Sequence, residues 1–530
     1  MDTWFFIIAT FCICAFLKFV LIVNDKSNLR RHLPPGSRRL PVIGDLWLLR
    51  KSFSDIELIL RDLKDKHGPI ITFWIRSSRP AIFISSHSLA HKALVQNGAV
   101  FSNRPEAPLA SKVFGSNQHN ISSATYGPTW RILRRNLTSE ILHPSRIKTY
   151  SAARKWVLEI LVGRLKSREA DHQPVKVMDH FQYAMFCLLA LMCFGDKLDE
   201  DHIKEIETIQ RKLLLRLGGF NVLNLFPKFI SKIIFPNLWN EIFQLRQDQE
   251  NTLIPLIKAR IEAKRRAREG RELETNILAY VDTLVDLQLT EEAEDGKRKL
   301  NMDEIVSICS EFLNAGTDTT TTALQWIMAN LVKFPEIQEK AYREIHRVVG
   351  ENQLLLQGGF VKEEDLQKLP YLKAVVMEAL RRHPPGHFLL PHSVSEDVEL
   401  EGYVIPKNAT VNVMVADLGW DPNVWENPME FKPERFLNTP DNNNLVDHQG
   451  DRDGCREIKM MPFGAGRRIC PGSSLALLHL EYFVANLVWY FKWVPVDGDT
   501  NSVDLSEKQE FTVAMKNPLQ ARIFPRVESA

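Results

Sequence analysis

The chain has 530 residues, 45% of them hydrophobic, and its charged side chains leave a formal net charge of only +2. This length supports a large core, and the near-neutral balance gives no reason to expect a nucleic-acid partner. The seven cysteines are scattered and odd in number, which argues against the disulfide framework of a small secreted domain and favours a reducing compartment.

The first predicted element is an apolar helix over residues 4–23, interrupted only by Lys18. About 20 apolar residues span a bilayer, and Lys18 lies near enough to the end for its amine to reach the interface. A cleaved signal peptide is the alternative, but its positive charges would precede the apolar stretch. Here several Lys and Arg residues follow it. We therefore predict a single-pass signal anchor at residues 1–24, with the rest of the protein cytosolic.

A basic, proline-rich segment, residues 25–44, follows the anchor and contains LPPGSRRLPVIG. Prolines cannot continue the membrane helix and stiffen the chain, so this segment is predicted to be a hinge between the membrane and a globular body. An ordinary linker is the alternative. Residues 45–530 contain no internal repeat and no second linker, which predicts one large catalytic domain.

Helical patterns dominate this body, and strand-like runs occur at 71–85 and 398–415. The predicted fold is therefore mainly α with a small β portion. Two polar segments, 291–299 and 438–453, are predicted to be exposed loops.

The longest central helix is predicted over residues 301–334, and its middle reads NAGTDTTTT. Glycine and threonine form helices poorly, so this composition needs a reason. Gly316 leaves room for a bulky group near the backbone, and Thr319 can bond back to the carbonyl of Ala315. Asp318 beside Thr319 places an acid next to an alcohol. A buried threonine stripe between two helices is the alternative.

The segment MPFGAGRRICPG, residues 461–472, surrounds one cysteine with glycines and arginines just before an apolar helical pattern. Cys470 is therefore expected directly before a helix N-terminus, which stabilises a thiolate. No nearby histidine base or second cysteine favours a nucleophile or a redox thiol. A ligand to iron in a large flat cofactor accounts for the glycines and for the arginines, which can pair with acidic substituents. A buried structural cysteine is the alternative.

The pattern FxxGxRxCxG that ends at Gly472 resembles the haem-thiolate signature of cytochromes P450. Four more segments match motifs of that family in chain order: Trp130–Arg134, Ala315–Thr319, Glu378–Arg381 and Phe431–Phe436. The resemblance covers essentially the whole chain. In detail it is most similar to plant microsomal A-type P450s of family 89, subfamily A, with family 77 as the alternative. It implies the cytochrome P450 fold and a haem b cofactor.

The resemblance also implies roles for individual residues. Cys470 would be the axial thiolate ligand of the haem iron, and Asp318 and Thr319 would be the catalytic acid–alcohol pair. The other implied haem contacts are Phe463, Ala315, Gly316, Arg468, Trp130, Arg134 and His392. The implied structural ion-pair triad is Glu378, Arg381 and Arg435.

The acid–alcohol pair implies a monooxygenase that consumes O₂, because relatives that rearrange peroxides often lack it. The glycines of the cysteine motif lack the GxGxxG spacing, and no flavin or nicotinamide region is visible. NADPH electrons would therefore come from a separate NADPH–cytochrome P450 reductase. Candidates for its basic docking face are Arg131, Arg135, Lys459 and Arg467. The alternatives are a P450-like peroxide isomerase or dehydratase, and a non-catalytic membrane-anchored haem protein that binds ligands.

The family's pocket segments are largely apolar here, which predicts a hydrophobic small-molecule substrate. They correspond to residues 105–123, 215–226, 312–319, 386–390 and 511–516, and contain Phe114, Phe220, Phe312, Phe388, Leu389 and Phe511. Resemblance to subfamily 89A admits linear tetrapyrroles from chlorophyll breakdown, with oxidative removal of a formyl group. Terpenoids, phenolics and fatty acids remain open. The expected location is the endoplasmic reticulum membrane, in contact with lipid.

Overall fold

The computed structural model describes residues 33–37, 51–76, 79–170, 173–269, 277–290, 297–350, 359–437 and 458–526, together with Thr10 and Cys14. The rest of the predicted anchor, most of the predicted hinge and the predicted loop at 438–453 lie outside the described residues. The chain divides into two compact units. The smaller is Met1–Pro105 with Leu389–Met414, and the larger is Glu106–Phe388 with Val415–Ala530. The single catalytic domain over residues 45–530 stays a prediction.

The smaller unit is built on a four-stranded sheet. Its strand order is β1 (Ile70–Arg76), β2 (Arg79–Ile84), β9 (Thr410–Val413) and β6 (His392–Ser393). β1 and β6 pair antiparallel with their neighbours, and β2 pairs parallel with β9. The unit also contains α3 (Phe53–His67), α4 (His87–His91), a π-helical turn (Lys92–Gln96) and a hairpin of β7 (Val398–Leu400) and β8 (Tyr403–Ile405). The strand-like runs predicted at 71–85 and 398–415 are confirmed.

The larger unit is mainly helical. Its α-helices are α5 (Leu109–Phe114), α6 (Pro128–Asn136), α7 (Pro144–Thr149), α8 (Ser151–Ala170), α9 (Val177–Phe194), α10 (Glu200–Arg216), α11 (Lys228–Ile234), α12 (Pro236–Arg268), α13 (Tyr280–Leu284), α14 (Met302–Lys333), α15 (Pro335–Gly350), α17 (Pro370–Arg382), α18 (Val415–Gly419) and α19 (Ser473–Tyr490). Its strands are β3 (Val175–Lys176), β4 (Gln288–Thr290), β5 (Lys297–Lys299), β10 (Phe491–Pro495), β11 (Glu507–Gln509), β12 (Val513–Met515) and β13 (Gln520–Pro525). The prediction of a mainly α fold with a small β portion is confirmed.

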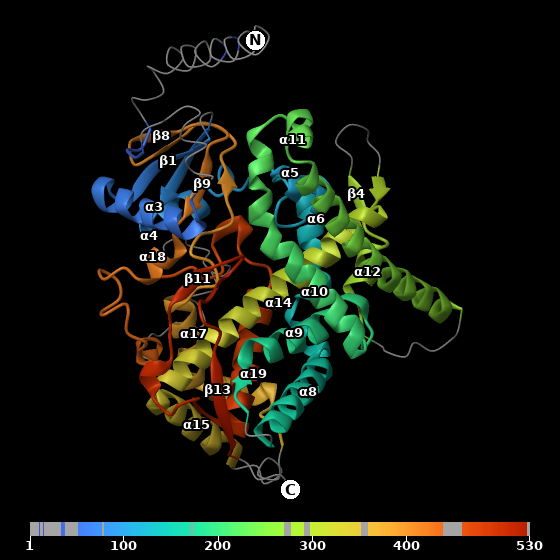
Figure 1. Ribbon diagram of the computed structural model, residues 1–530, viewed down its shortest axis with the longest axis vertical. Helices are drawn as coiled ribbons and strands as arrows, with labels where there is room; N and C mark the ends of the chain where they lie inside the picture. Colours follow the sequence, from blue (N-terminus) through green and yellow to red (C-terminus); the bar gives the residue numbers. More distant parts are fainter. Residues whose placement is uncertain are drawn as a thin grey trace, which may run out of the picture. The chain divides into compact units, whose positions relative to one another are not determined.

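The central helix of this unit is α14, which packs against α9, α10, α12, α17 and α19 (Figure 1). It begins after Asn301, whose side chain accepts from the Glu304 amide while the Glu304 carboxylate accepts from the Asn301 amide. This capping box satisfies amides that the helix start leaves unpaired. The helix ends before Phe334 and Pro335, because proline cannot continue it. The predicted helix over 301–334 is therefore confirmed.

Helix α9 lies against α14 and forms much of the core. Within the described part of the chain, it is the one helix long and apolar enough to cross a membrane. Its side chains from Phe181 to Phe194 are buried within the larger unit, and a helix that is apolar all round is typical of the core of a large protein.

One predicted loop differs in the structure. Residues 297–299 of the predicted segment 291–299 form β5, which pairs antiparallel with β4, and residues 291–296 lie outside the described residues. The strand forms despite its Lys-Arg-Lys sequence because its backbone pairs with that of β4. On β4, Leu289 is buried, with 2% of its surface exposed. Polarity alone suggested a loop, whereas backbone pairing across the hairpin decided the structure.

Candidate functional site

Cys470 lies at the end of a tight loop before α19. Gly464 and Gly466 adopt φ angles of +74° and +70°, a left-handed region that glycine enters without a steric penalty. The resulting turn brings the Cys470 amide within 2.8 Å of the Phe463 carbonyl. Helix α19 begins at Ser473, directly after Gly472, so the predicted position of the cysteine before a helix N-terminus is confirmed.

Burial raises the pKa of the Cys470 thiol above its usual value, while the Gly472 amide and the charge of Arg134 oppose this shift. The helix N-terminus thus lowers the pKa of the thiol, as predicted, but burial has the larger effect. Transferring an anionic sulfur out of water costs more free energy than these two groups contribute. A coordinating metal ion deprotonates such a thiol outright. The sulfur is therefore suited to be a metal ligand and poorly suited to be a free thiolate nucleophile.

Three of the predicted haem contacts gather beside this loop: Trp130 and Arg134 on α6, and Arg468. The Arg468 guanidinium lies 4.4 Å from the centre of the Trp130 ring and donates to two backbone carbonyls in segment 121–124, at 3.1 and 2.6 Å. Trp130 Nε1 donates to one of the same carbonyls at 3.1 Å. Arg134 donates to the Ile469 carbonyl at 2.6 Å. The structure thus brings two cations and an indole to the cysteine loop.

The residues of this corner fit a haem. Cys470 supplies one soft sulfur donor, which suits haem iron. Burial lowers the pKa of the Arg134 guanidinium, and both Arg134 and Arg468 bond to neutral carbonyl oxygens. A carboxylate in place of a carbonyl would form a stronger, charge-assisted bond with a desolvated guanidinium. The acidic substituents of a porphyrin meet that requirement.

The acid and the alcohol on α14 have distinct partners. Thr319 Oγ1 donates to the Ala315 carbonyl at 2.7 Å, as predicted. The Asp318 carboxylate accepts from Thr512 Oγ1 at 2.8 Å. Burial raises the pKa of Asp318, and the Thr512 bond and the charge of Arg211 oppose the rise. A carboxyl group with a raised pKa keeps its proton to a higher pH, which suits a proton donor.

Gly316 has a different neighbour from the one expected. A side chain at this position would lie 2.5 Å from Leu189 Cδ1 on α9. The close approach of two helices therefore accounts for the glycine, and Leu189 is the bulky group beside it. Ala315, one residue earlier, is exposed. The implied contacts of Ala315 and Gly316 with haem stay predictions.

Glu378, Arg381 and Arg435 form the ion-pair cluster that the sequence motifs implied. Arg381 binds both oxygens of Glu378 at 2.8 Å, and Arg435 Nε lies 3.4 Å from the same carboxylate. Glu378 is 0% and Arg381 1% exposed. The Lys432 amide also donates to Glu378 at 2.8 Å. The cluster therefore fastens α17 to the segment around residue 435.

We predict that Glu378→Gln lowers the free energy of unfolding by about 3–5 kcal/mol, because it leaves the buried Arg381 charge uncompensated. Denaturant unfolding would measure the loss. The matched control is Asp62→Asn, which removes an exposed pair with Lys66 and should cost less than about 1 kcal/mol. Equal, small effects of the two substitutions would show that the cluster does not support the core.

The surroundings of three more predicted residues are as follows. His392 belongs to the smaller unit, where it is buried on β6 with Nδ1 2.7 Å from the Phe101 carbonyl, and its haem role stays a prediction. Phe114 and Phe220 pack into a buried cluster with Trp239 on α12. Large aromatic rings are most stable when enclosed, which accounts for this cluster, and the place of the two phenylalanines in the substrate pocket stays a prediction.

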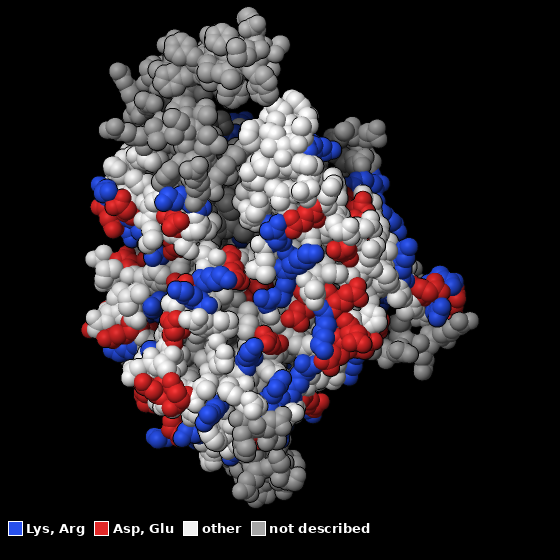
Figure 2. Space-filling model, in the orientation of Figure 1, with Lys and Arg blue, Asp and Glu red and all other residues white. Residues whose placement is uncertain are grey.

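Part of the predicted basic face forms around Tyr126. The guanidinium groups of Arg131 and Arg467 lie 5.0 and 5.4 Å from its ring centre, and Arg467 also donates to its hydroxyl. Arg467 is part of the loop that ends at Cys470, and Arg131 lies on α6 beside this loop. Their use in docking stays a prediction. Elsewhere, Figure 2 shows acidic and basic side chains interspersed over the face in view.

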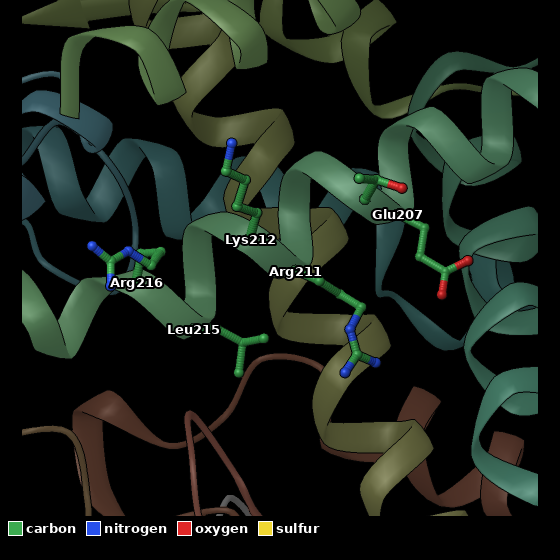
Figure 3. Close-up of a pocket in the computed structure, with 6 residues that line it drawn as sticks. Glu207, Arg211, Lys212, Leu215 and Arg216 are labelled. Carbon is green, nitrogen blue, oxygen red and sulfur yellow. The ribbon is translucent and has the colours of Figure 1, made fainter. Parts of the chain in front are cut away.

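A separate hollow of about 510 Å³ lies along α10. Figure 3 shows Arg211 and Leu215 extending to one side of this helix and Lys212 to the other. Arg216 is engaged by Glu241 at 2.6 Å. The positive charge of Arg211 also favours the ionised form of Asp318 on α14 and so opposes the rise in the pKa of that carboxyl group.

The comparisons with known proteins agree with this geometry. The family model for cytochrome P450 matches residues 34–521. The chain is 51% identical to cytochrome P450 89A9 of Arabidopsis thaliana over 528 residues, 98% of each chain. It is 30% identical to salviol synthase of Salvia pomifera over 529 residues, 98% of this chain and 97% of that protein.

A solved structure of a zebra fish cytochrome P450 with progesterone has a TM-score of 0.71 to this chain. It covers 89% of this chain and 99% of its own, at 21% identity, which is a likeness of fold. The predicted fold is thus confirmed, and a relative of half-identical sequence carries the family number, 89, that the sequence motifs indicated.

Proposed function

The chain belongs to the cytochrome P450 family and is a monooxygenase by class, and we propose that it inserts one atom of O₂ into a hydrophobic small molecule of plant metabolism. The observation that carries the proposal is the group formed by the Cys470 loop with Arg134 and Arg468. The second support is the acid–alcohol pair of Asp318 and Thr319 on α14.

Family membership implies a haem cofactor, and bound haem would supply the iron at which O₂ is activated. Cys470 Sγ would hold that iron, with Phe463 packed beside the sulfur. Arg134, Arg468 and Trp130 would hold the propionates, and His392 would add a further bond. Ala315 and Gly316 would lie along its face.

In the proposed mechanism, Asp318 holds the proton on its carboxyl group, in a setting where burial raises its pKa. Thr319 Oγ1 lies one residue further on the same helix and would pass that proton to the reacting oxygen. To pass a proton on, Thr319 must release the bond that its own hydroxyl proton makes to the Ala315 carbonyl, because a hydroxyl carries only one proton. In this way Asp318 and Thr319 would deliver one proton at a time. The packing of α14 would limit the access of bulk water.

Electrons would come from NADPH through a separate reductase that docks on the basic face of Arg131, Arg135, Lys459 and Arg467. NADPH-dependent O₂ uptake with purified reductase tests the proposal. No uptake would favour the alternatives, a peroxide isomerase or dehydratase or a non-catalytic haem protein, and turnover of a lipid hydroperoxide without NADPH would separate those two.

Linear tetrapyrroles from chlorophyll breakdown, with oxidative removal of a formyl group, are the substrate class we propose first, because of the 51% identity to a family 89 protein. Terpenoids, phenolics and fatty acids are the other candidates. Titrating the purified haem protein with members of each class, and reading the shift of the haem absorption band, would identify the class that binds.

The proposed location is the membrane of the endoplasmic reticulum, with an anchor at residues 1–24, a hinge at 25–44 and a cytosolic catalytic domain at 45–530. Helix α11 supports membrane contact, since Phe229 and Ile233 are 67% and 77% exposed and the surface over it carries little charge (Figure 2). Exposed apolar patches of this kind mark interaction with membranes or other proteins.

This orientation predicts that the sequons at Asn120, Asn136 and Asn408 carry no glycan, because they stay cytosolic. Asn136 is 8% exposed and bonded to Thr283, so it is inaccessible in the folded chain on either side of the membrane. Asn408 is exposed and is the informative site. A loss of mass at Asn408 on glycosidase treatment of the native protein would contradict the orientation.

A further inference from the structure

We propose that Thr512 is a positioning residue that holds the Asp318 carboxylate in the orientation needed for proton delivery. This inference deepens the proposed monooxygenase function and rests on it. Thr512 lies at the tip of the β11–β12 hairpin, 194 residues from Asp318 in the chain, and its Oγ1 lies 2.8 Å from Asp318 Oδ2. This threonine belongs to the predicted pocket segment 511–516 but to none of the five family motifs.

The direction of the hydrogen bonds follows from chemistry. Thr512 Oγ1 also lies 2.9 Å from Thr322 Oγ1 on α14. When Asp318 is ionised, its carboxylate can only accept, so Thr512 then uses its single proton for Asp318 and Thr322 donates to Thr512. Thr512 is 5% and Thr322 0% exposed. In such a dry setting a bond to a carboxylate is strong and directional, so it fixes one oxygen of Asp318.

The hairpin tip is itself held in place. Trp326 Nε1 on α14 donates to the Val513 carbonyl at 2.8 Å, and the Val513 amide donates to the Pro385 carbonyl at 2.8 Å. These two bonds, made by the carbonyl and the amide of the same residue, hold Val513 in place and so restrain the adjacent Thr512 beside α14. Thr512 therefore acts as a fixed donor, in contrast to a mobile surface hydroxyl.

Phe511 gives this arrangement a link to the substrate. It is 43% exposed, precedes Thr512 directly, and belongs to the pocket segment predicted at 511–516. The residue that orients the acid is thus adjacent to one predicted to contact the substrate.

Charged groups on two neighbouring elements also act on Asp318. Arg211 on α10 (Figure 3) favours the ionised form, and Glu510 on the hairpin opposes it. The largest effect, burial, raises the pKa of Asp318, and the Thr512 bond is the first effect that lowers it. If the Thr512 hydroxyl is removed, fewer groups oppose the effect of burial on Asp318. The pKa of Asp318 should therefore rise.

The test uses the full-length, haem-loaded protein with three substitutions. Thr512→Val removes the hydroxyl at nearly constant volume, and Thr512→Ser keeps it. Thr322→Val removes the bond between Thr322 and Thr512 but leaves Thr512 its own proton for Asp318. Infrared spectra, with the spectrum of Asp318→Asn subtracted, isolate the Asp318 carboxyl band, and its titration midpoint is measured in each variant.

We expect the midpoint to rise by about one pH unit in Thr512→Val, a tenfold change in proton affinity, and to stay unchanged in Thr512→Ser and Thr322→Val. With purified reductase and NADPH, hydrogen peroxide released per NADPH should rise at least about twofold in Thr512→Val. In the Asp318→Asn background, Thr512→Val should have no further effect on this ratio, because the two residues act as one unit.

The proposal is overturned if Thr512→Val leaves the midpoint unchanged, or if Thr322→Val shifts it equally, which would point to general loosening of the hairpin. If the wild-type protein consumes no NADPH with reductase, the proposed function fails. The infrared midpoint does not depend on turnover and still decides the role of Thr512.

Discussion

Cys470→Ser is expected to abolish the thiolate-type absorption band that a haem-thiolate protein shows after reduction and addition of carbon monoxide. A serine alcohol is not a soft anionic donor at neutral pH, and the pKa of an alcohol lies far above that of the thiol it replaces. Monooxygenase activity should fall to background, since the anionic sulfur favours O–O cleavage. The difference spectrum of the purified variant, together with its haem content, measures both effects.

The control for this substitution is Cys187→Ser. Cys187 is buried on α9, where burial raises the pKa of its thiol to about 11, and it has no proposed contact with haem. It should keep the wild-type carbon monoxide band. A wild-type band in Cys470→Ser would refute the assignment of the ligand, and its loss in both variants would indicate damage to the fold.

Thr319→Ala is expected to uncouple the reaction. The variant should still bind haem, substrate and reductase, because alanine forms helices better than threonine and Thr319 bonds only within its own helix turn in the described contacts. Proton delivery would become disordered, so product formation should fall by at least about tenfold. NADPH consumption should fall less, and hydrogen peroxide should account for the difference. The ratio of product to NADPH is the measurement.

Thr321→Ala is the matched control. Thr321 Oγ1 makes the same kind of bond, to the Thr317 carbonyl at 2.7 Å, but its side chain is 0% exposed and lies on a different face of α14. It should leave the product ratio near the wild-type value. A wild-type ratio in Thr319→Ala would end its proposed role, and equal uncoupling in both variants would point to a loosened helix.

The elements best predicted from the sequence are those whose signals are local. The central helix was predicted over residues 301–334, and in the structure α14 has Asn301 as its N-cap and ends before Phe334 and Pro335. The position of Cys470 before a helix could be predicted in the same way, because the glycines around it and the apolar helical pattern that follows are properties of adjacent residues. The bond from Thr319 to Ala315 spans one helix turn and could be foreseen for the same reason.

What the sequence could not supply are contacts between distant segments. Nothing local to Gly316 indicates that Leu189 fills the space beside it, and nothing local to Thr512 indicates Asp318. The burial of Phe114 and Phe220 against Trp239 depends on how α5 and α12 meet, and their place in the substrate pocket stays a prediction. Likewise, three basic residues formed β5 because a partner strand was available. Tertiary packing decided each of these cases.

The bond between Arg134 and the Ile469 carbonyl joins positions 335 residues apart, and this has a consequence for biogenesis. The haem-binding corner cannot close on a nascent chain until the ribosome has synthesised nearly all of it. Contacts of such high sequence separation form late and slowly, and the intermediate exposes apolar surface that invites aggregation. Fragments that stop before residue 469 should therefore depend on chaperones and be degraded without retaining cofactor.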